Sequence, residues 1–207
     1  EYVYCTASRF CPDAPVPILK PESFVSTLGM AGNVVDNLES LEIEVKLISN
    51  ANKIKKTRYV DNKTNHMFFR IDEGEDDVFP IAQKSLDNIN WENYNAVVIS
   101  DYCKGFIDED TIKYISKQHP ITFLDNNYKD SLIITRGSNG AEYKGNTYPV
   151  KKVDVKDTSG AGDSFLAGLV GNYLETYNIV EAIKFANKCA TQVVQKKGTA
   201  KINKNEL

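Results

Sequence analysis

The sequence has few of the residues on which several common kinds of functional site depend. Its 207 residues include two histidines, four cysteines, one tryptophan and two methionines. The cysteines form no CxxC pair, and no His-rich segment accompanies them, so we do not expect a structural zinc site. We expect His66 and His119 to be turn or surface residues, and all four thiols to be reduced.

Two further features are missing: an excess of positive charge and a long apolar run. The 25 basic and 28 acidic residues give a net charge of -3, and such a chain has no field that attracts nucleic acid or an anionic membrane surface. No stretch approaches the ~18 apolar residues of a membrane span, and the first ten residues lack the apolar run of a signal peptide. We therefore expect a cytoplasmic protein that binds neither nucleic acid nor membranes.

The residues that are present fit a globular domain, since 42% are hydrophobic and 10% are aromatic. In the first third, Pro15 and Pro17 are two residues apart, which suits an edge strand in residues 14–19. Residues 34–41 carry an apolar stripe at helical spacing. Residues 57–72 alternate in polarity on both sides of a polar turn, which predicts a β-hairpin.

The centre of the chain has the pattern of an α/β protein. Short apolar runs lie at residues 96–100, 121–125 and 131–135, and such runs are typical of strands buried on both faces of a parallel sheet. Residues 108–118 fit a crossover helix between the first two runs. Two apolar stripes at helical spacing then predict two helices at the C-terminal end.

The spacing of two of these elements is too short for a parallel connection. Only five residues separate the second and third apolar runs, whereas a parallel crossover needs about a dozen. Either these two strands pair antiparallel, or residues are absent from the chain. A similar shortfall precedes the hairpin, and we expect omitted segments near 49–53 and 125–131.

The clearest chemical signal is DTSGAGDSFLAGLV at residues 157–170. Three small residues, Gly160, Ala161 and Gly162, run into a helix predicted to begin near Asp163. Small residues let backbone N–H groups converge on an oxyanion, and a helix N-terminus adds about half a positive charge there. Asp163 could accept the proton of an attacking hydroxyl beside a bound phosphoryl group. Alternatively, the turn is only a tight helix entry and Asp163 its N-cap.

These segments resemble those of a known family. DTSGAGDSF is similar to the DTxGAGDxF signature of the ribokinase-like (PfkB-type) sugar kinases. LGMAGNVVDNLESL (28–41) resembles the family's N-terminal sugar-side segment, and ITRGSNGAEY (134–143) resembles its nucleotide-side strand and turn. Four further segments most resemble the kinases of heptose 7-phosphate: residues 8–19, 56–60, 68–72 and 100–107.

The resemblance implies an α/β fold, the ribokinase-like three-layer αβα sandwich with a small β-sheet lid. The lid would be formed by about residues 2–28 and 56–73, and residues 1–207 would be a single sugar-kinase domain whose first strand precedes Glu1 and is missing. ATP with Mg2+ would transfer its γ-phosphoryl group to a hydroxyl of a sugar or sugar phosphate, such as heptose 7-phosphate. The apolar lid implies a homodimer formed through it.

The resemblance also implies roles for individual residues. Asp163 would be the catalytic base, with an anion hole formed by Gly160, Ala161 and Gly162. Substrate would be bound by Gly29, Asn33, Arg58, Arg70 and Lys104. The nucleotide would lie along Thr135, Gly137, Gly140, Asn187 and Gly198. A monovalent cation is bound in some relatives at the positions that match Asp157 and Ser159.

Several of these residues have an alternative structural role. Asn33 could cap its helix, and Lys104 could be a solvated loop lysine. Arg58 and Arg70 could pair with the acidic residues at 72–75 across the hairpin. Cysteine at position 103 more simply occupies a small-residue position than acts as a nucleophile.

Two departures from the family pattern leave the function open. Met30 replaces a glycine of the sugar-side segment, and an NxxE segment expected after Asp125 is absent. The alternatives to a heptose 7-phosphate kinase are a ribokinase, fructokinase or nucleoside kinase, and a catalytically inactive protein that binds a sugar or a nucleotide.

Overall fold

The structure is a computed structural model that describes residues 1–50, 52, 54–125 and 132–207. The omitted segments that we predicted near 49–53 and 125–131 fall mainly on the gaps between these ranges, so that prediction lies outside the described residues. The chain divides into two compact units. One comprises Glu1–Thr27 and Asn50–Val78, and the other comprises Leu28–Ser49 and Phe79–Leu207.

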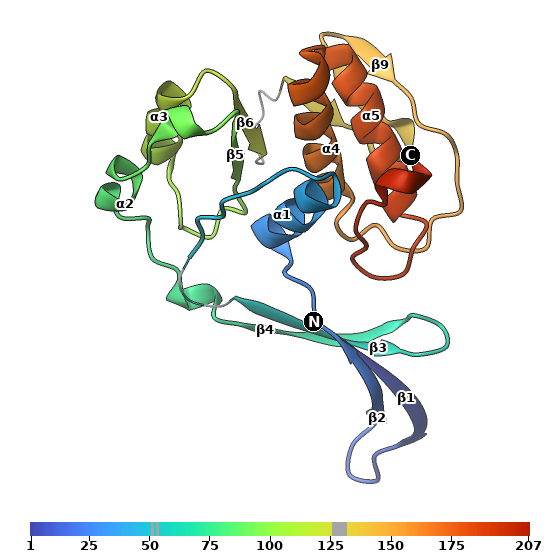
Figure 1. Cartoon of the computed structure of the whole chain (residues 1–207). Coiled ribbons are helices and arrows are strands. Elements are labelled where there is room, and N and C mark those ends of the chain that lie inside the picture. The colour runs from blue at the N-terminus through green and yellow to red at the C-terminus, as the bar shows by residue number, and fades with distance from the viewer. Residues whose placement is uncertain (51, 53, 126–131) are drawn as a thin grey trace. The chain divides into compact units, whose positions relative to one another are not determined.

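The first unit is a four-stranded sheet in the order β2-β1-β3-β4. Its strands are β1 (Tyr2–Phe10), β2 (Pro17–Val25), β3 (Lys55–Asp61) and β4 (Met67–Glu73) (Figure 1). β2 contains Pro17 and Pro21 and lies at an edge, where a residue without an N–H group costs no ladder hydrogen bond. β3 and β4 are antiparallel, which confirms the predicted hairpin.

The register of this sheet assigns its side chains to two faces. Val3 lies opposite Phe24 and beside Tyr59, and Tyr59 lies opposite Phe69, so these four share one face. The rings of Tyr59 and Phe69 stack with their centroids 4.6 Å apart. Arg58, next to Tyr59 along β3, is on the other face.

The second unit has helices on both faces of a parallel pair of strands, β5 (Val97–Ser100) and β6 (Thr122–Asp125). Helix α3 (Glu109–Gln118) connects them, as predicted. Ile99 packs against α3 and the short helix α2 (Gln83–Asp87). On the other face, Val98 and Phe123 pack against a hydrophobic cluster formed by helices at residues 30–40, 161–176 and 179–193. Alternate side chains of β5 therefore contact different helix layers.

Three helices form the other layer: α1 (Met30–Ser40), α4 (Ala161–Thr176) and α5 (Ile179–Val193) (Figure 1). α4 and α5 are the two helices predicted at the C-terminal end. They approach each other closely at Gly168, where an added Cβ atom would lie 2.7 Å from the Cys189 Sγ. α1 packs against α4 through Leu38 and Leu166.

The second unit also contains an antiparallel sheet, and its strand pairing contradicts one of the sequence predictions. It contains β7 (Ile133–Thr135), β8 (Ala141–Tyr143) and β9 (Asn146–Tyr148) in that order. The apolar run at 131–135 was predicted to be a strand of the parallel sheet, but β7 instead pairs antiparallel with β8. The reason is the intervening turn, which is only long enough to reverse the chain. The remaining short 3-10 turns are Glu75–Asp77, Trp91–Asn93, Gly137–Asn139 and Lys204–Glu206.

The two histidines differ in environment. His66 is exposed in the turn between β3 and β4, as predicted. His119 is buried at the C-cap of α3, so its assignment to the surface was wrong. Its Nε2 lies 3.0 Å from the carbonyl oxygen of Tyr94, and its Nδ1 lies 3.1 Å from the amide of Ile121. These contacts fix the chain where α3 ends and β6 begins.

All four cysteines are unpaired. None of the helices in the described part of the chain has the length and apolar character that a membrane-spanning helix requires.

Candidate active site

The N-terminus of α4 presents backbone amides that no side chain caps. Gly160 precedes the helix with φ 79°, a left-handed conformation that favours glycine. A Cβ atom at Gly160 would lie 2.6 Å from the Asn33 Nδ2, whereas a Cβ atom at Gly162 would meet nothing within 4 Å. Asp163 is the third residue of the helix, so its interpretation as the N-cap is wrong. The amides of the first turn have no acceptor within the helix.

The Asp163 side chain is buried, and each of its carboxylate oxygens accepts a hydrogen bond. Asn33 Nδ2 donates to Oδ2 over 2.7 Å, and the Tyr102 hydroxyl donates to Oδ1 over 2.5 Å. Burial, followed by the negative charge of Asp163, raises the pKa of Tyr102. Tyr102 therefore stays protonated and remains a donor at physiological pH.

Asn33 belongs to a buried polar network that joins α1, α4 and the C-terminal segment. Asn37 Nδ2 donates to the carbonyl oxygen of Asn33 over 2.7 Å. Asn37 Oδ1 accepts from the Ser164 hydroxyl over 3.3 Å and from the amide of Ile202 over 2.9 Å. The N-cap of α1 is Gly29, and no side chain caps this helix, so the capping role considered for Asn33 is wrong. The Asn33 side chain instead holds Asp163 in place.

A pocket of about 270 Å3 opens beside these residues. It is lined by Asp101, Tyr102, Asp125, Thr158, Gly160, Ala161, Gly162 and Asp163. The pocket therefore contains the predicted base and the whole predicted anion hole.

Asp101 and Asp125 reach this pocket because they stand at the carboxyl ends of the parallel strands β5 and β6, where ligands bind in open α/β sheets. The amide of Asp101 donates to the carbonyl oxygen of Asp125 over 2.9 Å. Burial and the charge of Asp163 raise the pKa of Asp125. Within the described residues, no group of three or more His, Cys, Asp or Glu side chains forms a site that could hold a metal ion.

Sequence analysis missed several residues of this site: Asn37, Asp101, Tyr102, Asp125, Thr158 and Ser164. The two aspartates carried a usable signal, because each stands at or just after the end of an apolar run predicted to be a parallel strand. The signal for Asn37 was its spacing of four residues from Asn33, which puts two amides on one face of a helix. Tyr102 carried no comparable signal.

All five residues predicted to bind substrate, Asn33 included, lie outside the pocket lining. Gly29 has φ 62° at the N-cap of α1, and Lys104 is half-buried in the turn after β5. The two arginines belong to the four-stranded sheet, where Arg58 and Arg70 are direct cross-strand partners. Arg70 Nε lies 2.7 Å from Asp72 Oδ1, so Arg70 does pair with one of the predicted carboxylates, although along β4 and not across the hairpin.

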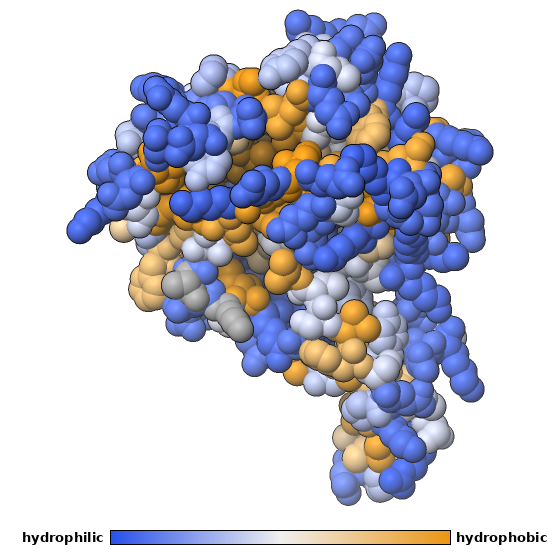
Figure 2. All heavy atoms as spheres, viewed as in Figure 1, coloured by the Kyte–Doolittle hydropathy of each residue, from blue (hydrophilic) through white to orange (hydrophobic). Residues whose placement is uncertain are grey.

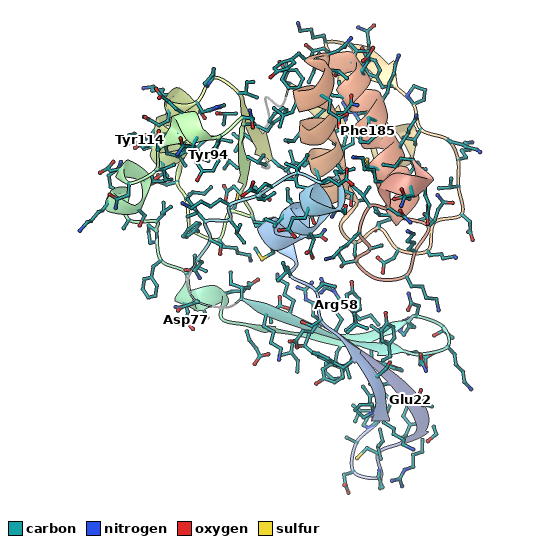
Figure 3. The ribbon with its side chains drawn as sticks, in the orientation of Figure 1. Glu22, Arg58, Asp77, Tyr94, Tyr114 and Phe185 are labelled. Atoms are coloured by element: carbon teal, nitrogen blue, oxygen red, sulfur yellow. The ribbon has the colours of Figure 1, made fainter. Side chains whose placement is uncertain are left out.

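Arg58 has a different environment from Arg70. Its guanidinium carbon lies 5.3 Å from the centre of the Tyr2 ring, a cation-π contact. Figure 3 shows Arg58 on β3. The pairing with hairpin carboxylates that we considered is therefore not the contact that the structure gives for Arg58.

The residues predicted to bind the nucleotide lie in or near the sheet of β7, β8 and β9 and helix α5, and the pocket lining contains none of them. Thr135 ends β7, and Gly137 and Gly140 form the turn that follows. A Cβ atom at Gly140 would lie 2.0 Å from the carbonyl oxygen of Tyr148, so only glycine fits there. Asn187 Nδ2 donates to the same oxygen over 2.8 Å.

The two residues predicted to bind a monovalent cation stabilise the loop before α4. Asp157 Oδ1 accepts from the amide of Ser159 over 2.8 Å, and Asp157 Oδ2 accepts from the amide of Gly198 over 3.1 Å. Asp157 therefore ties the small-residue turn to the segment after α5.

Comparison with known proteins connects this site to a family. The family described as "pfkB family carbohydrate kinase" matches residues 121–206. The chain is 27% identical, over 290 residues, to "Bifunctional protein HldE" of Helicobacter pylori (strain Shi470). It is 24% identical to the protein of the same name from Campylobacter jejuni (strain RM1221). Both matches cover the whole chain but only 63% and 61% of the relatives, so the relatives are longer proteins.

Solved structures match the fold. Ribokinase from Arabidopsis thaliana, solved with ribose and ATP, is similar with a TM-score of 0.66 and 13% identity, over 98% of this chain and 92% of that one. A putative sugar kinase from Clostridium perfringens gives a TM-score of 0.63 and 15% identity, over 96% and 87%. The chain therefore has the ribokinase-like fold, and residues 121–206, which include the helix that carries Asp163, are similar to the pfkB family of carbohydrate kinases.

Proposed function

We propose that this chain is a sugar kinase domain that transfers the γ-phosphoryl group of ATP to a hydroxyl of a sugar or sugar phosphate. The observation that carries the proposal is one shared pocket. It places the Asp163 carboxylate next to the uncapped amides at the start of α4. A base and an anion site side by side are the two groups that phosphoryl transfer to an alcohol requires.

In this mechanism Asp163 accepts the proton of the attacking hydroxyl. Asn33 holds Oδ2, so the substrate hydroxyl would approach Oδ1, which accepts from the Tyr102 hydroxyl in this structure. The amides of Gly162 and Asp163 stabilise the negative charge that spreads over the transferring phosphoryl group. The helix dipole of α4 acts in the same direction, because its positive end is at Gly160.

Mg2+ would enter this pocket together with the ATP phosphates. Carboxylate oxygens are the protein ligands that Mg2+ prefers, and it commonly takes one or two of them plus phosphate oxygens. Asp125 and Asp101 offer such oxygens, and a cation would offset the repulsion between Asp125 and Asp163 that raises the pKa of Asp125. The ion would neutralise phosphate charge during transfer.

The paired arginines support a substrate that already carries a phosphate. Arg58 and Arg70 are direct cross-strand partners, so both guanidinium groups leave the same face of the sheet, although Arg70 also pairs with Asp72. Guanidinium groups bind phosphate through two hydrogen bonds, so this face offers two groups of the type that a phosphate requires. We therefore propose a sugar phosphate similar to heptose 7-phosphate as the acceptor, in agreement with the sequence resemblance of residues 56–60 and 68–72.

The remaining binding residues are proposed on the family resemblance. Thr135, Gly137, Gly140, Asn187 and Gly198 would lie along the nucleotide. Gly29 and Lys104 would contact the sugar, and Asp157 with Ser159 would hold a monovalent cation. Asn33, which the resemblance also assigns to the sugar, would act through the Asp163 carboxylate that it holds. Because ATP is the proposed co-substrate, we also propose a cytoplasmic location.

The sheet of the first unit supports a homodimer. Its register puts Phe24, Phe69 and Ile71 on one face, and these side chains are 42% to 57% exposed. Figure 2 shows hydrophobic residues at the surface of this unit. We propose that a second copy covers this face, because contiguous exposed apolar surface of this kind is typical of an interface.

The function is tested with the Asp163→Asn variant. Asparagine keeps the shape of the side chain but cannot take a proton, so phosphoryl transfer falls by about 100-fold or more, while ATP binding measured by calorimetry changes little. Asp110→Asn is the control, because Asp110 is 95% exposed on α3. ADP release is measured with heptose 7-phosphate, ribose, fructose and nucleosides as acceptors. Unchanged turnover in Asp163→Asn, or no acceptor among these sugars, would contradict the proposal.

A further inference from the structure

The Tyr102 hydroxyl occupies the position on Asp163 that an acceptor alcohol needs. It donates to Oδ1 over 2.5 Å, while Oδ2 is already engaged by Asn33. An attacking sugar must first donate a hydroxyl to the oxygen of the base that Asn33 does not hold. The protein therefore carries, in its own chain, a hydroxyl group at the acceptor position.

This contact matters because water competes with the sugar as an acceptor. A base that can deprotonate a sugar hydroxyl beside ATP can also deprotonate water, and the result is wasteful ATP hydrolysis. The carboxylate of Asp163 faces an open pocket that water can enter. As long as Tyr102 donates to Oδ1, a water molecule must compete with the phenol for that oxygen.

The phenol is suited to block water without reacting itself. Burial and the charge of Asp163 raise its pKa, so it remains a neutral donor and a weak nucleophile. It is also removable. The Tyr102 residue is 39% exposed in the turn after β5, so its ring can turn away without opening the core. The backbone beside it stays anchored, because the amide of Cys103 donates to Asp101 Oδ1 over 2.9 Å.

We propose that Tyr102 is a positioning residue that keeps water away from Asp163 until an acceptor sugar displaces its hydroxyl. The inference rests on the proposed kinase function and goes beyond it, because it concerns the choice between sugar and water. It predicts that the loss of one hydroxyl changes the ratio of ATP hydrolysis to sugar phosphorylation, which a merely structural role would leave unchanged.

The test is the Tyr102→Phe variant, which keeps the ring and removes the hydroxyl. We expect ADP release without sugar to rise about tenfold, since one hydrogen bond to a charged group no longer has to be broken. The KM for the sugar falls for the same reason, and the ratio of ADP released without sugar to sugar phosphorylated rises. The matched control is Tyr114→Phe. The Tyr114 hydroxyl also donates to an aspartate, Asp87 Oδ1, over 3.2 Å, and neither residue lines the pocket. Figure 3 shows Tyr114 on α3.

A second measurement detects the contact without enzyme activity. Tetranitromethane nitrates tyrosine rings in their phenolate form, and peptide mass spectrometry reads each tyrosine separately. Nitration of Tyr102 should be slow in the wild type and faster in Asp163→Ala, which removes both the acceptor and the charge. Equal rates in the two proteins would overturn the inference.

The outcomes separate this inference from the proposed function. If the wild type phosphorylates no sugar, the proposed function fails, and nitration still reports whether Tyr102 covers Asp163. If the wild type is active but Tyr102→Phe hydrolyses ATP no faster, or loses both reactions in proportion, the inference is wrong. Phosphorylation of Tyr102 itself in ATP without sugar would also overturn it, because the phenol would then be an acceptor.

Discussion

Replacing Gly162 by alanine should separate the stability of the protein from its chemistry. Gly162 lies in the first turn of α4 with a helical backbone, and an added Cβ atom would meet nothing within 4 Å. Alanine is favoured over glycine in a helix by about 0.5 to 1 kcal/mol. For a chain of this size, that gain raises the melting temperature by roughly 1 to 4 °C. The folded protein should therefore become slightly more stable.

The same methyl group should damage catalysis. Gly162 lines the pocket, so the open space beside it is the space that the phosphoryl oxygens must enter to reach the amides. Loss of one donor to such an oxyanion lowers kcat by about 100-fold to 1000-fold. Thermal unfolding and a coupled ADP-release assay on the same preparation measure both effects. Wild-type kcat/KM in Gly162→Ala would refute the anion site, and a lower melting temperature would refute the open space.

Gly160→Ala is the matched comparison, because it fails for structural reasons. An alanine at φ 79° costs about 1 to 2 kcal/mol. Its Cβ atom would lie 2.6 Å from the Asn33 Nδ2 and 3.0 Å from the Thr199 Cγ2. This variant should lose stability and activity together, since it displaces the amide that holds Asp163. If Gly162→Ala is more stable but less active than the wild type, while Gly160→Ala is less stable and less active, then the loss of activity at Gly162 cannot be a consequence of unfolding.

Two further predictions concern the charge and the polar network of the site. The raised pKa of Asp125 means that folding disfavours its charged form, so wild-type stability falls as the pH rises through that pKa. Asp125→Asn should therefore have a higher melting temperature than the wild type near pH 7, and the same melting temperature at pH values below the ordinary range of aspartate. A lower melting temperature near pH 7 would contradict this. Asn37→Leu should lower the free energy of unfolding, measured with a denaturant, by about 2 to 3 kcal/mol, because it leaves the amide of Ile202 buried without an acceptor. A decrease below ~0.5 kcal/mol would refute the network.

Local patterns predicted most elements of the fold, but not every pairing. The hairpin of β3 and β4 and the parallel strands β5 and β6 followed from alternation, apolar runs and the helix between them. The strand β7 was assigned to the wrong sheet, because a short apolar run looks the same in a parallel and in an antiparallel sheet. The short turn at Gly137–Asn139 determines its partner, because so few residues can only reverse the chain and return it beside β7.

The site divides in the same way between local and distant information. Gly160, Gly162 and Asp163 lie within four residues, so one motif revealed them. The contact of Tyr102 with Asp163 joins residues 61 positions apart, and the bond from Ser164 to Asn37 spans 127 positions. No pattern along a single sequence reports such pairs, because they depend on how β5, α1 and α4 pack. The family resemblance placed Asn33 at the site, but its hydrogen bond to Asp163 emerged only from the packing.

The two oxygens of Asp163 therefore have different roles, and the difference follows from the burial of their donors. Asn33 is 2% exposed and tied to a network that holds two helices together, so its hydrogen bond to Oδ2 persists whatever the pocket contains. Tyr102 is 39% exposed on a turn, so its bond to Oδ1 can be exchanged. A base anchored on one oxygen and exchangeable on the other keeps its orientation while its partner changes from phenol to sugar. This asymmetry lets a rigid fold serve a reaction in which one group must leave before another enters.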